Sequence, residues 1–358
     1  MQKIAIIGLG LIGGSIAKAL KQSDLKFEIS GFDKKRVADQ AINEKVIDKK
    51  LNVIEEALEH DVIFVCLPVT KSIEVIEQLA PVLHNNTILT DVCSIKGKIK
   101  DVVEKSGCKA LYIGGHPMTG KEKGGYENSD PLLFENSTYI INDDVKDNPK
   151  AVPFFNLIKS MGAKIYFVDA DLHDRIVANV SHLPQMLSVA LVNNISLNVD
   201  GIKYTDFAAG GFRDMTRIAS SDFNVWESII DINKNKIIDS IDNFQSYLSN
   251  IKKKIIYSEF LSLAEEFENA RFNRDEIPKD TKGFLTPLHD LFVFVSDVPG
   301  IISKISTALF EKRINIKDIE LLKIREGTGG TFRLSFDNEN DVKEAKVILE
   351  GIGFETKE

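Results

Sequence analysis

A glycine-rich string lies near the start of the chain, between a short apolar run and a stretch with helical spacing. It reads Gly8-Leu9-Gly10-Leu11-Ile12-Gly13. Glycines at this spacing allow a tight turn, a close approach of a phosphate to the backbone and close packing of a helix on a strand. Asp33 follows the next apolar run, where a carboxylate can accept both hydroxyls of a ribose. The pattern predicts a dinucleotide site with NAD preferred; the cationic run Lys34–Arg36 leaves NADP open, and a packing turn without a ligand is the other alternative.

A second string places a histidine after another apolar run. It reads Gly114-Gly115-His116-Pro117-Met118-Thr119-Gly120-Lys121-Glu122. Ligands bind at the carboxyl ends of strands in open α/β sheets, so we expect His116 to face a ligand. A polar residue whose bonds are satisfied within the fold is the alternative. Four other histidines have no supporting pattern and are expected to be structural or solvated: His60, His84, His173 and His289.

Two arginines lie in a third string, residues 210–222, which reads GGFRDMTRIASSD. Arg213 and Arg217 are four residues apart, and Asp214 is three from Arg217, so on a helix they share one face. Guanidinium groups bind planar carboxylates through paired hydrogen bonds. The string therefore predicts an anion site, with a surface ion-pair network as the alternative. Trp226, the only tryptophan, follows nearby and is expected either to line that site or to pack in a core.

The elements that would position these residues alternate over residues 1–169. Short apolar runs are separated by amphipathic stretches such as residues 73–83, where apolar side chains recur at helical spacing. Strands of nearly continuous apolar sequence indicate a parallel sheet covered on both faces. We therefore expect an α/β Rossmann-like domain with strands at Ile4–Ile7, Glu28–Phe32, Val62–Cys66, Ile88–Asp91, Ala110–Gly114, Tyr139–Ile141 and Lys164–Val168.

Residues 170–275 show helical spacing and no convincing two-residue alternation. Apolar side chains recur on one side at Ile176, Val180, Leu183 and Leu187, and a longer stripe covers residues 229–251. We expect an all-α helical domain for substrate binding and dimerisation. Its stripes would bury against each other or against a second subunit, and both options stay open.

The last part of the chain returns to mixed patterns. Residues 276–287 are polar and carry two prolines and a glycine, which indicates a linker. Over residues 288–358 the strand and helix patterns follow the order β-α-β-β-α-β. That order predicts a C-terminal ferredoxin-like domain.

Composition excludes several classes of protein. The 358 residues carry a formal net charge of −8, which argues against general nucleic-acid binding. The three cysteines, Cys66, Cys93 and Cys108, contain no C-x-x-C pair, so we expect no disulfide framework, no metal site and a cytoplasmic location. The apolar run near the N-terminus is broken by glycines and by Lys18, and no later apolar stretch reaches about 18 residues, so neither a secretory signal nor a membrane span is expected.

In combination, these strings resemble the prephenate dehydrogenase family. The resemblance is carried, in the family's order over residues 1–255, by GLGLIGGS, Asp91-Val92-Cys93-Ser94-Ile95-Lys96, HPMTGKE, Ser181-His182-Leu183-Pro184 and GFRDMTRIASSD. The C-terminal unit resembles an ACT domain, a module that senses small molecules, through Asp297-Val298-Pro299-Gly300 and Arg313-Ile314-Asn315-Ile316.

The resemblance implies an NAD-dependent oxidative decarboxylation of prephenate to 4-hydroxyphenylpyruvate, in tyrosine biosynthesis. It implies that a neutral His116 accepts the hydrogen bond and finally the proton of the substrate hydroxyl, and that Ser94 orients His116. Arg217 would hold a substrate carboxylate. The other substrate candidates are Arg213, Asp214, Glu122, Lys121, His182, Gln185 and Trp226, and the cofactor candidates are Gly8, Leu9, Gly10, Leu11, Ile12, Gly13, Asp33 and Pro68.

Two positions depart from the family pattern. Lys121 stands where many members carry threonine, and Gln185 where some carry histidine. Both bear on the substrate, so an arogenate dehydrogenase is one alternative and a non-catalytic sensor of NAD and an amino acid is another. The ACT resemblance implies subunit pairing in a homodimer and feedback inhibition by tyrosine, with a purely structural role as the alternative. The regulatory candidates are Asp297, Pro299, Gly300 and Asn315.

Overall fold

A computed structural model describes residues 2–121, 123–276, 288–325 and 329–357. The chain divides into two compact units, Met1–Phe267 and Glu268–Glu358. The expected linker lies outside the described residues except for its first residue, Glu276, which ends a helix. The boundaries expected for a separate helical domain, 170 and 275, stay a prediction.

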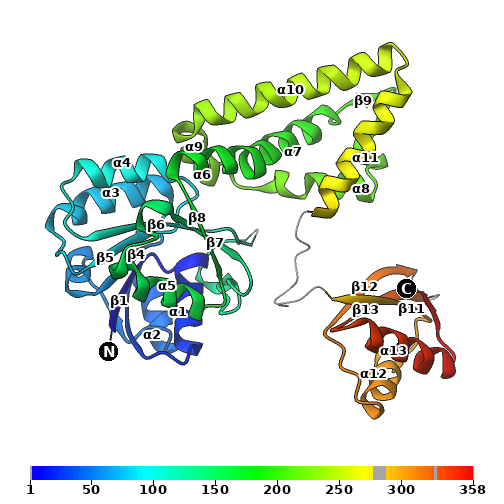
Figure 1. Ribbon diagram of the computed structural model, residues 1–358, viewed down its shortest axis with the longest axis horizontal. Helices are drawn as coiled ribbons and strands as arrows, with labels where there is room; N and C mark the ends of the chain where they lie inside the picture. The colour runs from blue at the N-terminus through cyan, green and yellow to red at the C-terminus, as the bar shows by residue number, and fades with distance from the viewer. Residues whose placement is uncertain (1, 122, 277–287, 326–328, 358) are drawn as a thin grey trace. The chain divides into compact units, whose positions relative to one another are not determined.

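The first unit is built on an eight-stranded sheet with the order β3-β2-β1-β4-β5-β6-β7-β8 (Figure 1). All seven expected strands are present, and β3 is an addition that pairs over two residues. The strands are β1 Gln2–Ile7, β2 Phe27–Phe32, β3 Lys49–Lys50, β4 Val62–Val65, β5 Ile88–Asp91, β6 Leu111–Pro117, β7 Thr138–Asn142 and β8 Lys164–Val168.

The expectation of an all-parallel sheet is wrong at one edge. Strands β1 to β6 pair in parallel, but β7 runs antiparallel to β6, with His116 opposite Ile140. Parallel neighbours need a crossover connection, usually a helix. The described part of the β6–β7 connection contains only a short 3-10 turn, Tyr126–Asn128, so the chain folds back on itself. A helical crossover, α5 (Val152–Ser160), then makes β8 parallel to β7.

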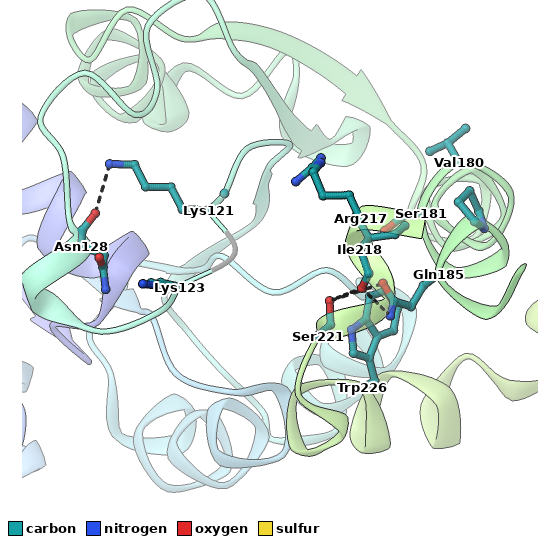
Figure 2. A pocket seen from close by; sticks show the side chains of 12 residues that line it. Lys121, Lys123, Asn128, Val180, Ser181, Gln185, Arg217, Ile218, Ser221 and Trp226 are labelled. Atoms are coloured by element: carbon teal, nitrogen blue, oxygen red, sulfur yellow. Dashed lines mark hydrogen bonds between the residues drawn. The ribbon is translucent and has the colours of Figure 1, made fainter. Parts of the chain in front are cut away.

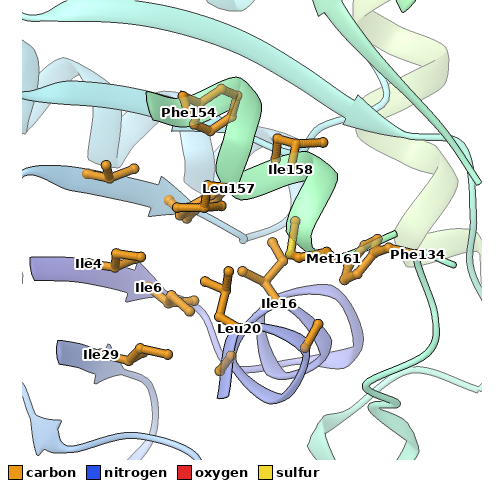
Figure 3. Close-up of a cluster of buried hydrophobic side chains, with 14 of the residues drawn as sticks. Ile4, Ile6, Ile16, Leu20, Ile29, Phe134, Phe154, Leu157, Ile158 and Met161 are labelled. Atoms are coloured by element: carbon orange, nitrogen blue, oxygen red, sulfur yellow. The ribbon is translucent and has the colours of Figure 1, made fainter. Parts of the chain in front are cut away.

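Helices cover both faces of this sheet because side chains alternate along each strand. In β1, Ile4 and Ile6 face a core formed with one set of helices, whereas Ala5 and Ile7 face the other core. Figure 3 shows the first core, in which Ile16 and Phe154 pack over the strands. The helices on this face are α1 Leu11–Gln22, α2 Lys35–Asn43 and α5, and those on the opposite face are α3 Val69–Leu79 and α4 Gly97–Lys105.

Helices dominate the rest of the first unit, as expected. They are α6 Ala170–Val177, α7 Leu183–Asn194, α8 Gly210–Thr216, α9 Phe223–Ile232, α10 Lys234–Ile256 and α11 Phe260–Glu276, whose last residues belong to the second unit. One small hairpin was not anticipated, β9 Asn198–Val199 with β10 Ile202–Lys203. Within the described ranges, no helix is long and apolar enough to cross a membrane.

The apolar stripe expected on α6 and α7 is buried at Leu183 but exposed at Val180. A π-helical turn, Ala178–His182, joins the two helices and adds a residue to the repeat. Val180 is consequently 59% exposed. The buried side of this segment carries Val177, Ala178 and Leu183, and it also carries polar side chains, namely His173, Asp174, His182, Gln185 and Ser188. Such a polar buried face needs a functional or hydrogen-bonding reason.

The long stripe on α9 and α10 is buried only in its first part. Ile229 and Ile237 are buried, whereas Leu248 is 50% and Ile256 62% exposed. Large apolar side chains continue this exposed surface into α11, where Phe260 and Leu261 are exposed. The outer part of the stripe therefore has no partner within the described first unit.

The second unit contains a four-stranded antiparallel sheet in the order β12-β13-β11-β14, packed against α12 and α13. Its elements are β11 His289–Val295, α12 Ile301–Glu311, β12 Asp318–Arg325, β13 Gly329–Phe336, α13 Glu339–Gly351 and β14 Glu355–Lys357. The order confirms the expected ferredoxin-like unit. The turn Asp297–Gly300 precedes α12, and Gly300 has a φ of +86° at its N-cap, a conformation that favours glycine. Asn315 is exposed beyond the other end of α12.

Candidate active site

The glycine string forms the turn between β1 and α1. Gly8 has a φ of +97°, and a Cβ there would overlap the carbonyl oxygen of Cys66. A Cβ on Gly13 would overlap the carbonyl oxygen of Gly8, so helix and turn pack at backbone distance. Gly10 is different, because no atom lies within 4 Å of the place its Cβ would take. The loop thus leaves open the position at which a pyrophosphate approaches the start of a helix, and it fits NAD.

Asp33 is fixed beside this loop. Its carboxylate accepts hydrogen bonds from the amides of Leu9 and Lys34, each at 2.6 Å. Pro68 follows β4 at the N-cap of α3, next to the loop, since the amide of Cys66 donates to the carbonyl of Ile7 at 2.7 Å. Arg36, of the cationic run, pairs with exposed Glu127 at 2.9 Å. The carboxylate of Asp33 therefore lies beside the loop, where it could bind a ribose, and Arg36, one of the cations that would favour NADP, is paired with Glu127.

The reacting candidates lie along the same edge of the sheet. Strands β1, β2, β4, β5 and β6 are parallel, so their carboxyl ends meet at one edge. The glycine loop follows β1 there, Ser94 lies three residues beyond β5, and His116 lies in the last part of β6. Ser94 and His116 are both half-buried. The structure thus brings the candidate dinucleotide-binding loop and the candidate catalytic residues to one edge of the sheet.

His116 has a partner that sequence reasoning missed. Its Nδ1 lies 2.9 Å from Nε2 of His173, and the other nitrogen of His173 lies 2.8 Å from a carboxylate oxygen of Asp174. His173 is fully buried on α6. The only signal in the sequence was the adjacent His-Asp pair after β8, which has no characteristic spacing to His116. His173 was expected to be structural or solvated; it is buried, and its contact with His116 was not anticipated.

Burial governs the protonation of these histidines. It lowers the pKa of His116 well below the ordinary histidine value, and the charge of nearby Lys96 acts in the same direction. Burial also lowers the pKa of His173, although Asp174 opposes that shift. For Asp174, burial disfavours the charged form, but the bonds from His173 and from the amides of Lys96 and Gly97 outweigh it and lower the pKa. At neutral pH the two imidazoles are neutral and the carboxylate is charged.

A buried ion pair supports the strand that carries His116. Lys96 and Asp91 are both fully buried and form a salt bridge. The ammonium of Lys96 also donates to the carbonyl of Gly115 at 2.7 Å, next to His116. Asp91 additionally accepts from the hydroxyl of Tyr112 at 2.7 Å and from the amide of Cys93 at 2.8 Å. This network ties the loop after β5 to the end of β6.

A cavity of about 710 Å³ lies in the first unit (Figure 2). Of the predicted substrate residues, Lys121, Gln185, Arg217 and Trp226 line it. The full described lining is Gly120, Lys121, Lys123, Asn128, Val180, Ser181, Pro184, Gln185, Arg217, Ile218, Ser221 and Trp226. Three of these residues are cationic and none is acidic, so the described lining suits an anion.

Buried Gln185 on α7 forms hydrogen bonds with the segment that carries Arg217, on one side of this cavity. Its amide nitrogen donates to the carbonyl of Ile218 at 3.1 Å, and the hydroxyl of Ser221 donates to its oxygen at 3.5 Å (Figure 2). The segment next to Arg217 is thereby tied to α7. On the other wall, Lys121 pairs with Asp130 at 2.9 Å.

Several predicted residues lie elsewhere. Arg213 and Asp214 are exposed on α8, which ends at Thr216, so Arg217 belongs to the next, 3-10 segment, and the three do not share one regular helix. His182 is buried and packs edge-on against Trp226, with ring centroids 5.8 Å apart. Burial lowers the pKa of His182 to about 4, so it stays neutral. Glu122 lies outside the described residues.

The glycine loop and His116 at one sheet edge are typical of a dinucleotide-dependent dehydrogenase, and a ferredoxin-like unit follows them in the chain. Three family models match the chain in order. They are the nucleotide-binding domain of prephenate dehydrogenase at residues 16–167, its dimerization domain at residues 169–269 and the ACT domain at residues 289–350.

Known relatives agree with these matches. The prephenate dehydrogenase of Lactococcus lactis is 34% identical over 357 residues, which cover 98% of either chain. The crystal structure of prephenate dehydrogenase from A. aeolicus with hydroxyphenyl propionate and NAD+ superposes with a TM-score of 0.72 at 30% identity, covering 78% of this chain and 99% of that one. The crystal structure of Synechocystis arogenate dehydrogenase superposes with a TM-score of 0.69 at 26% identity, covering 77% of this chain and 100% of that one. The chain belongs to the prephenate dehydrogenase family and is an NAD-dependent oxidoreductase.

Proposed function

We propose that this protein converts prephenate to 4-hydroxyphenylpyruvate with NAD, as a step in tyrosine biosynthesis. The observation that carries the proposal is a neutral histidine, His116, at the sheet edge where a glycine loop fits NAD. Bound NAD supplies the hydride acceptor. His116 takes the proton of the ring hydroxyl as its carbon is oxidised, and returns a proton to the phenol oxygen after carbon dioxide has left. Arg217 binds a carboxylate, and Ser94 orients the hydroxyl.

The charges of the cavity support prephenate over arogenate. The described lining includes three cationic residues, Lys123, Arg217 and Lys121, of which Lys121 is paired with Asp130, and none of the described lining residues is a carboxylate that would pair with an ammonium group. Prephenate is the keto acid, whereas arogenate carries an added ammonium group. A lining of this charge favours the substrate without that group.

Steady-state rates with both substrates and both dinucleotides test this proposal. We expect kcat/KM to be highest for prephenate with NAD. Faster turnover of arogenate would assign the chain to the alternative reaction. Tight NAD binding without turnover of either substrate would support the non-catalytic sensor.

We further propose that the protein is a homodimer that pairs through its helices. Leu248, Ile251 and Ile256 on α10 and Phe260 on α11 form an exposed apolar surface. A second copy is the occupant that the match to a dimerization domain supports. Burial of this surface removes water from large apolar side chains, which stabilises the pair.

Tyrosine is proposed as the effector of the second unit. The turn Asp297–Gly300 leads into α12, whose first amides can donate hydrogen bonds to a carboxylate. Deletion of residues 288–358 is expected to leave an active enzyme, since the first unit is compact and the A. aeolicus relative matches 78% of this chain with its whole length. We expect the tyrosine concentration that halves the rate to rise at least about fivefold. Rates measured over a tyrosine series check this, and unchanged inhibition would place sensing at the active site.

A further inference from the structure

We propose that His173 and Asp174 are positioning residues that set the tautomer of His116, so that its Nε2 is the atom that accepts the substrate proton. The inference rests on the proposed role of His116 as the base. It is drawn from a continuous line of hydrogen bonds, His116 to His173 to Asp174, that ends on backbone amides.

The carboxylate at the end of this line is fixed from three sides. Oδ1 of Asp174 accepts the amide of Lys96 and Nδ1 of His173, both at 2.8 Å, and Oδ2 accepts the amide of Gly97 at 2.9 Å. The carbonyl of the same residue accepts Nδ2 of Asn233 at 2.9 Å. Because an ionised carboxylate can only accept, the proton between Asp174 and His173 belongs to Nδ1 of His173.

This assignment determines the rest of the line. A neutral His173 that carries its proton on Nδ1 has a bare Nε2, which can only accept. The hydrogen bond of 2.9 Å to His116 therefore requires that Nδ1 of His116 donates. His116 is then left with a bare Nε2, which is the form a general base needs.

The dyad formed by His173 and Asp174 also affects His116 after it has accepted the substrate proton. When Nε2 of His116 takes the substrate proton, the ring becomes cationic, and its Nδ1–H bond to neutral His173 strengthens. The proton stays on His116 and is not passed along the line. The other charged or titratable groups around the pair are Lys96, Asp91 and His182.

Three variants of the full-length protein test the proposal. His173→Leu removes the acceptor, whereas His173→Gln keeps an acceptor and a donor about as far apart as the ring nitrogens. We expect the leucine variant to lose about 10- to 100-fold in kcat with little change in KM, and the glutamine variant to recover most of that loss. His60→Leu is the matched control, because His60 is also buried, is bonded at both nitrogens and lies at the opposite end of β4.

The pH profile separates positioning from a merely structural role. Loss of the acceptor disfavours the protonated ring, so the acid limb of kcat should move to lower pH in His173→Leu and stay in place in His173→Gln. A shift to higher pH would mean that His173 acts as a nearby positive charge instead, and would overturn the proposal. The proposal would also be overturned if the acid limb of kcat stayed in place and His173→Leu and His173→Gln were equally slow.

Nitrogen-15 chemical shifts of the imidazoles give a readout that needs no turnover. In the resting protein we expect His116 and His173 each to be protonated at Nδ1 and bare at Nε2. Failure of prephenate turnover with this pattern intact would reject the proposed function alone. The opposite tautomer of His116 in an active enzyme would reject the positioning dyad alone.

Discussion

Replacing His116 by alanine is expected to lower kcat for prephenate by about 10²- to 10⁴-fold, the usual contribution of a positioned general base. KM for NAD should change little, because the site proposed for the cofactor is the glycine loop with Asp33. His84→Ala is the control, since His84 is an exposed histidine. Steady-state kinetics at neutral pH measure both constants, and thermal unfolding shows that the variant is folded.

The pH profile of the wild-type enzyme is a second test of His116 as the general base. A base must be neutral to accept a proton, so activity is lost when His116 is protonated as the pH falls. Burial holds the pKa of His116 well below its ordinary value, so the acid limb should lie below the pH at which a free imidazole titrates. A kcat that is unaffected by His116→Ala, with the acid limb still present, would assign the proton to another group.

The second large effect is on stability. Lys96→Met is expected to lower the free energy of unfolding by about 3–5 kcal/mol, because it leaves the carboxylate of Asp91 buried without its cation. The carbonyl of Gly115 loses a donor in the same step. Chemical denaturation, read by circular dichroism, measures the change.

Two further variants show whether charge is the cause. Lys21→Met removes the partner of Asp48 in an exposed pair and should cost less than about 1 kcal/mol. Adding Asp91→Leu to Lys96→Met should restore part of the stability, since an apolar pair leaves no isolated charge. If Lys96→Met alone were as stable as the wild type, the hydrogen bonds from Tyr112 and the amide of Cys93 would be enough to stabilise the buried carboxylate of Asp91.

Local patterns predicted the parts of the site whose geometry is local. Gly8, Gly10 and Gly13 lie within six residues, and their roles follow from steric limits on one turn. His116 was predicted because it follows an apolar run. His173 was missed because its importance comes from one contact with a residue 57 positions away, and no periodicity records such a contact.

Errors in the fold have the same origin. The direction of β7 depends on what connects it to β6, and the described part of that connection contains only a short 3-10 turn, so the chain turns back. Which residues of α6 and α7 are buried depends on the π turn, because one residue added to the repeat leaves Val180 exposed and lets His182 share the buried side with Leu183. Neither event has a marked composition, whereas the alternation of apolar runs and amphipathic stretches identified the sheet and its covering helices.

The three glycines of the loop between β1 and α1 are expected to differ in what a substitution would disturb. Any side chain at Gly8 or Gly13 meets backbone, so variation there is removed by failure to fold. A methyl group at Gly10 meets nothing in the protein alone, and Gly10→Ala should be invisible in a screen for thermal stability yet raise KM for NAD. In a library of variants, residue 10 would therefore report purely on the presence of a bound dinucleotide, and its neighbours two and three residues away would report on the protein itself.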